Sequence, residues 1–274
     1  MASHLACIGL GVENQVELDR LLAAVYPRAV VIGRMGRREV RRWEDPSGAR
    51  LIFRLDDGKP AGFSPAFAGR PGAFVMGGAQ IGESSWNVAI VHVDGEQQTG
   101  AAVDLEQGGL AEPVTLPAQA SIVALGRSIA GFPDAEAFAA SSASLLGPSR
   151  DGEERPANLP EHFVWPPRMG PESFISYGVF APDVGGSAGA EPIARMHGTV
   201  LASERRTASE TGQEFGVVRV RTTGMEVDLC IAGSDLTQPI EPGQIIGGEV
   251  YLSASIETSP ANHANLGSLQ ARPS

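Results

Sequence analysis

Alternating apolar and polar residues dominate the chain from Ile193 onward. Every second residue is apolar over 225–231 and again over 250–256, which is typical of strands with one face turned inward. The segment 215–222 is rich in β-branched residues on both faces, as in a strand buried on both sides. Turn residues separate these runs. The pattern predicts an all-β barrel domain over residues 161–256.

The first 56 residues predict a strand, a helix and then three strands. Leu5–Val12 is an apolar run that we expect to form a strand. Asn14, with Glu17 three residues later, predicts a helix start, and apolar residues at helical spacing continue until Pro27. Three further strands are expected at residues 29–33, 38–43 and 50–55, the last two joined by a turn at 45–48.

This element order, together with Trp43-Glu-Asp-Pro-Ser-Gly-Ala-Arg-Leu-Ile-Phe53, resembles the repeating module of the vicinal oxygen chelate superfamily, which includes glyoxalases and bleomycin-resistance proteins. Members of that superfamily pair two modules around a divalent metal, with ligands on matching strands. The resemblance covers residues 1–56 and implies that His4 stands near the position of the first-strand ligand. Residues 72–146 could hold a diverged second module.

The middle of the chain continues the α+β pattern. Strands are expected at 86–93, 99–105 and 121–126, and a helix from Pro133 to Leu146. The fold class predicted is therefore α+β, with an N-terminal mixed antiparallel sheet and two helices over residues 1–146. A polar, proline-rich linker at 147–160 leads to the barrel, and a disordered tail is expected at 257–274.

Composition narrows the classes of partner. The formal net charge of −11 and the lack of a long basic block argue against a nucleic-acid partner. No window approaches the roughly 18 apolar residues that cross a bilayer, so no membrane partner is expected. No basic leader precedes an apolar run at the start, which favours a cytoplasmic protein. Cys7 and Cys230 are expected to be buried free thiols, with a disulfide as the alternative.

In its run of short strands, the segment 193–256 resembles an oligonucleotide/oligosaccharide-binding (OB) fold. Nucleic-acid-binding members of that fold stack bases on aromatic rings in a basic groove. This stretch offers only Phe215 and Tyr251, and its arginines are offset by acidic neighbours. We therefore interpret the barrel as a structural or protein-contact module.

The sharpest concentration of charge surrounds Val40. On a strand, Arg38 and Arg42 share the face of Val40, while Arg37 and Arg41 point the other way. Arg38 and Arg42 are therefore candidates for binding an anionic ligand or an acidic partner. The alternative is a solvated edge strand whose charge prevents aggregation.

No catalytic sequence motif is present, and the five histidines are scattered singly. A metal site assembled from distant strands stays open, with His4, His92 and Glu249 as candidate ligands. The alternative for each histidine is an ordinary core or surface residue. We predict a cytoplasmic binding or interaction protein without a cofactor, for an unidentified protein or small molecule; a homodimer stays open. The alternative is a divalent-metal-dependent enzyme of the vicinal oxygen chelate type.

Overall fold

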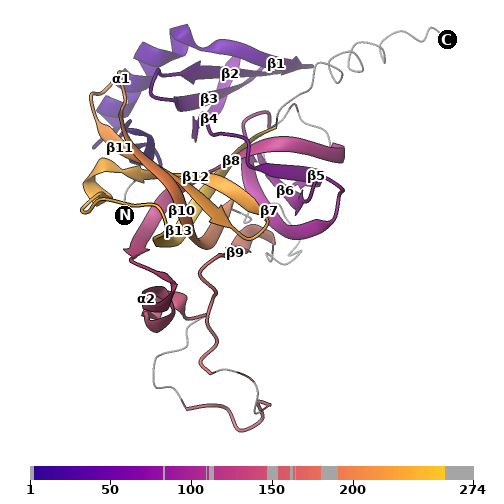
Figure 1. The fold of residues 1–274 in the computed structure, drawn as a ribbon. Helices are drawn as coiled ribbons and strands as arrows, with labels where there is room; N and C mark the ends of the chain where they lie inside the picture. Colours follow the sequence, from indigo (N-terminus) through magenta and orange to yellow (C-terminus); the bar gives the residue numbers. More distant parts are fainter. Residues whose placement is uncertain are drawn as a thin grey trace, which may run out of the picture.

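The computed structural model describes residues 3–82, 84–108, 110, 114–146, 154–160, 163, 165–179 and 191–256 (Figure 1). Within these residues the chain is mostly β-strand with two α-helices, broadly an α+β fold. The helices are α1 (Gln15–Val25) and α2 (Ala135–Ala140). The strands are β1 (Val30–Met35), β2 (Arg38–Glu44), β3 (Ala49–Asp56), β4 (Lys59–Phe67), β5 (Ala73–Gln80), β6 (Ser85–Val91), β7 (Gln97–Leu105), β8 (Val114–Phe132), β9 (Ser173–Ser176), β10 (Ile193–Thr207), β11 (Glu214–Thr222), β12 (Met225–Ala232) and β13 (Ile245–Ile256).

Helix α1 begins where the sequence predicts it. The Asn14 side chain accepts a hydrogen bond from the backbone N–H of Glu17 (3.1 Å), and the Glu17 carboxylate accepts one from the N–H of Glu13 (2.9 Å). These bonds satisfy N–H groups that have no partner inside the helix. The helix ends at Val25, and Pro27 lies in the 3-10 turn η2 (Tyr26–Arg28) that follows.

The strand expected at Leu5–Val12 is wrong. Its centre is the 3-10 turn η1 (Ala6–Ile8), closed by Gly9 with a positive φ of 72°. Cys7, Ile8 and Leu10 are fully buried in a cluster that reaches residues of β8, β11 and β12. The residues of this run are apolar because they are buried, and they do not pair in a β-ladder. The element order therefore lacks the strand that the vicinal oxygen chelate resemblance requires before the helix.

Strands β1 to β4 form an antiparallel sheet in that order, at the top of Figure 1. On one face, Trp43, Leu51 and Phe53 belong to the same apolar cluster as Leu21 and Val25 of α1. The other face, which carries Arg50 and Arg54, looks toward the remaining strands. The sheet is thus covered on both sides, and β1 forms one of its edges.

The other sheet contains nine strands, eight of which follow one another in a ring. The circuit runs β11-β12-β8-β5-β6-β7-β13-β10 and closes through pairing of β10 with β11. Strand β8 also pairs antiparallel with β13, from Ala120 to Phe132 against Ile256 to Ile245. This pairing crosses the circuit and divides it into two five-stranded rings, one with β5, β6 and β7, the other with β10, β11 and β12.

Two adjacent glycines let β13 fit between its neighbours. A Cβ on Gly247 would overlap the carbonyl oxygen of Met196 in β10. A Cβ on Gly248, whose φ is 149°, would overlap the carbonyl oxygen of Ser128 in β8. Backbones approach β13 closely from both sides here, which only glycine permits.

One continuous apolar core fills both rings. Its fully buried members come from strands of both halves, among them Ile90, Ile122, Met196, Leu229 and Leu252. The alternation predicted for β6 is confirmed, since Trp86, Val88 and Ile90 are buried. In β12, Val227 and Leu229 are buried as predicted, but the face expected to meet water is buried too: Asp228 pairs with Arg219, and Cys230 lies in the apolar cluster of α1. Among the described residues, no helix combines the length and apolar character required to span a membrane.

The rings take strands from both predicted domains. Strands β5–β8 lie within residues 1–146, and β10–β13 lie within 161–256, yet β8 and β13 share twelve paired positions. The four predicted barrel strands therefore close into a ring only with β8. Residues 147–153 of the predicted linker and the whole tail at 257–274 lie outside the described residues. Cys7 and Cys230 are both free and buried, as predicted.

Helix α2 is shorter than the predicted helix at 133–146 and covers His197 of β10. The Phe138 ring lies 4.6 Å from the His197 ring, and His197 is only 1% exposed. Within the described part of the chain, Nδ1 of His197 has no hydrogen-bond partner. Burial, with a contribution from nearby Arg195, lowers the pKa of His197 to about 4.

This buried histidine predicts acid sensitivity. The unfolded chain takes up a proton near the ordinary pKa of 6.5, whereas the folded state resists protonation until about pH 4. Stability should thus be full above pH 6.5 and decline by on the order of 3 kcal/mol as the pH falls to 4. Urea unfolding at several pH values measures this, and His197→Phe should flatten that part of the profile.

The matched control is His92→Gln, a substitution at an exposed histidine outside the contact with Phe138. An NMR titration of the folded protein in which His197 takes up its proton near pH 6.5 would contradict the assignment.

Candidate functional site

Strand β1 is an edge strand with apolar side chains in solvent. Among the described residues it pairs with β2 and with no other strand, so one side of its backbone has no strand partner. Val30, Val31 and Met35 are 61%, 40% and 46% exposed. Such residues on an unpaired edge form a template for another strand. We call Val30–Met35 the β1 edge.

The side chains of β2 alternate as predicted. Arg41 lies over the ring of Tyr26, next to α1, with 5.4 Å from the guanidinium carbon to the ring centre. Arg42 points to the opposite face and reaches Glu106, just after β7 (3.5 Å). Across the ladder, Val30 pairs with Arg42 and Met35 with Arg38. Val30 and Met35 therefore lie on the side of the sheet that faces the two strand rings, which we call the ring-facing side.

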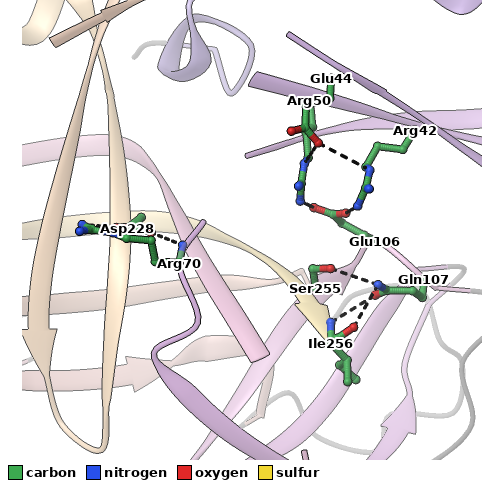
Figure 2. A network of polar contacts seen from close by, with 9 residues as sticks. All are labelled: Arg42, Glu44, Arg50, Arg70, Glu106, Gln107, Asp228, Ser255 and Ile256. Carbon is green, nitrogen blue, oxygen red and sulfur yellow. Dashed lines mark hydrogen bonds and ion pairs between the residues drawn. The ribbon is translucent and has the colours of Figure 1, made fainter. Parts of the chain in front are cut away.

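Arg42 is part of a buried ion cluster (Figure 2). The carboxylate of Glu106 is 2% exposed and lies 3.1 Å from Arg50 and 3.5 Å from Arg42. Glu44 contacts the same two arginines from a more exposed position, at 2.7 and 3.8 Å. Arg42 therefore already has internal anions as partners, and its predicted role in binding an external anion is not supported by its contacts.

Burial raises the pKa of Glu106, while Arg50 and Arg42 act in the opposite direction. Its backbone N–H donates to the carbonyl of Ala254 in β13 (2.8 Å). The neighbouring Gln107 bonds to Ser255 and Ile256, also in Figure 2. Glu106 is thus held at the end of β13, where it ties the four-stranded sheet to the rings.

A second connection lies beside it. Arg54 of β3 donates to Asp104 (2.8 Å) and to Ser64 of β4 (3.0 Å). The other oxygen of Asp104 accepts from the Tyr251 hydroxyl of β13 (2.8 Å). The two acids at the end of β7 therefore pair with three arginines on one face of the sheet, and this fixes its orientation.

Another buried carboxylate, Asp228, fastens the loop after β4. It accepts from the backbone N–H of Arg70 (2.6 Å) and lies 3.3 Å from the Arg219 guanidinium. Arg219 also donates to the carbonyls of Arg70 and Pro71. Every group here has a partner inside the protein, so we assign this cluster to stability.

Arg38 differs from Arg42. Its side chain is exposed at the turn end of β2, and within the described residues it makes no ion pair. Arg34 and Arg41 pair with Glu39, and Arg37 lies 3.5 Å from Asp56. Arg38 is therefore the one of the two predicted arginines that is available for an external anion.

The predicted metal ligands lie in different surroundings. The His4 ring stacks at 4.4 Å on Tyr251, and burial together with Arg127 lowers its pKa. Glu249 pairs with Arg127 (3.1 Å). His92 is exposed beyond the end of β6, beside an open hollow of about 360 Å³. The described residues contain no group of three or more His, Cys, Asp or Glu side chains placed to hold a metal, and the metal-dependent alternative remains a prediction.

Sequence reasoning selected the arginines but missed the apolar residues of the β1 edge and the acids that hold the sheet. Val30-Val31 next to a run of arginines was a usable signal for an exposed edge. Asp104 and Glu106 close an apolar strand, and acids at that position could have been considered as partners for the arginines of β2 and β3.

No family model matches the chain, and no curated protein or solved structure matches it significantly. The vicinal oxygen chelate resemblance therefore has no family match to support it.

The ion cluster predicts a large difference between two acids that contact the same arginines. Glu106→Gln should lower the free energy of unfolding by about 3 kcal/mol, because Arg50 and Arg42 lose their buried counter-charge. Glu44→Gln, at a position 43% exposed, should cost less than about 1 kcal/mol. Urea denaturation gives both values; equal losses would show that burial of Glu106 does not determine the strength of the connection.

Proposed function

We propose that this chain is a binding protein without catalysis that takes a partner polypeptide on the β1 edge. The observation that supports this most directly is the exposure of Val30, Val31 and Met35 on a strand that pairs on one side alone within the part of the chain that the structure describes. Folded proteins usually protect such edges with charge, proline or a covering element. The Leu110 side chain lies against Gly33 in the middle of β1, but no strand among the described residues pairs with this edge, which suits the addition of a strand from a partner.

The β1 edge belongs to a sheet that is held firmly. Helix α1 packs on one face, where the Tyr26 ring lies 5.2 Å from Phe53. Arg50 and Arg54 anchor the other face to buried carboxylates. A template already fixed in its bound shape loses little conformational entropy when a partner adds to it.

The rings serve as the support for this sheet. The ring of β8 and β10–β13 has the strand number of an OB-like barrel, and we propose that it acts as a structural module. Phe215 is fully buried and packs against Phe67 at 6.1 Å. The Tyr251 hydroxyl is bonded to Asp104. The aromatic side chains of Phe215 and Tyr251 are therefore both engaged inside the protein and are not available for base stacking. Together with the net charge of −11, this favours a protein partner over nucleic acid.

Site-specific photocrosslinking tests this proposal. A benzophenone side chain at Met35, within the β1 edge, should give a discrete adduct with a partner polypeptide in the producing cells. The same group at Val16 of α1 is the matched control, because Val16 is 58% exposed and lies outside the edge. It should give no discrete adduct.

Adducts of equal yield at both positions, or none at Met35, would overturn the proposal. Circular dichroism of each labelled protein shows whether the fold is retained, so that a missing adduct reports on the edge itself.

A further inference from the structure

From the charges around the β1 edge, we infer that its occupant is an extended acidic segment of a different protein, and that Arg38 binds a carboxylate of this segment. This inference rests on the proposed function and names the chemistry of the partner. It predicts carboxylates on the added strand, on the ring-facing side that Val30 and Met35 share.

The β1–β2 hairpin is a basic island in an acidic chain. Residues 30–43 contain five arginines and one glutamate, whereas the whole chain carries a net charge of −11. Glu39, the only acid of this segment, is shared by Arg34 and Arg41. Arg37 and Arg42 pair with acids outside the segment, Asp56 and Glu106, so Arg38 is the arginine of the hairpin that makes no ion pair among the described residues. An exposed positive charge of this kind attracts acidic partners and speeds their association.

Arg38 is placed to make the specific contact. It stands opposite Met35 in the ladder, one strand in from the edge. Neighbouring strands lie about 4.8 Å apart, so the long Arg38 side chain can extend over Met35 to a carboxylate on an added strand. Its guanidinium offers paired donors that match a carboxylate. Exposed Met35 and Val30 provide apolar contacts on the same side.

A second copy of this chain fits the edge poorly. Pairing two β1 edges would bring two basic hairpins together, each with Arg34, Arg37 and Arg38 exposed. Like charges at such short range oppose association. The charge pattern thus favours an acidic partner over a homodimer.

Three synthetic peptides test the inference with the purified full chain. Each is a decapeptide in which valine alternates with glutamate, glutamine or lysine. Fluorescence anisotropy should show the glutamate peptide binding at least about tenfold more tightly than the glutamine peptide at low salt. The difference should shrink as salt rises, because screening weakens exposed charge pairs. The lysine peptide should bind most weakly.

Two arginine variants assign the contact. Arg38→Gln should weaken the glutamate peptide about fivefold and leave the glutamine peptide unchanged. Arg20→Gln, an exposed arginine on α1, should alter neither affinity.

Equal binding of the glutamate and glutamine peptides, with a Met35 adduct still formed, would overturn the acidic partner but leave the proposed function standing. A Met35 adduct made of two copies of this chain would likewise overturn the acidic partner. Absence of both peptide binding and a Met35 adduct would instead refute the proposed function.

Discussion

The pairing of β8 with β13 is the constraint on which the rest of the structure depends. These strands pair along the whole length of β13, and both strands belong to each of the two five-stranded rings. Gly247 and Gly248 make this possible, because backbones approach β13 closely from β10 and from β8. Both rings share one apolar core. Separation of β8 from β13 would therefore expose the interior of both rings to water.

The buried acids at the end of β7 fix the position of the four-stranded sheet relative to the two rings. The backbone N–H of Glu106 is hydrogen-bonded to β13, and its carboxylate forms ion pairs with Arg50 and Arg42. Buried charges are costly unless paired, so these contacts favour one orientation of the sheet. That orientation covers both faces and leaves β1 at an edge, with its apolar side chains in solvent. The proposed binding edge is thus a consequence of how the rings hold the sheet.

Local patterns predicted local structure well. The Asn14 and Glu17 pair located α1, and alternation located β6 and β12. Length and pairing were not predictable in the same way: β8 extends over 19 residues through Pro117 and Gly126, which read as breaks. It stays extended because successive partners, β5 and then β12, pair along one edge. The β2 arginines were identified, but whether Arg38 or Arg42 is available depends on Glu106, which lies far away in sequence.

Native-state hydrogen exchange is the most direct test of whether the β8–β13 pairing holds both rings together, because it reports the opening free energy of each strand. We expect the amides of β8 and β13 in both rings to exchange slowest and to share one opening free energy. The outward-facing amides of β1 should exchange much faster than those of β3. Independent exchange of the two halves of β8, or protection of all β1 amides equal to that of β3, would contradict this expectation.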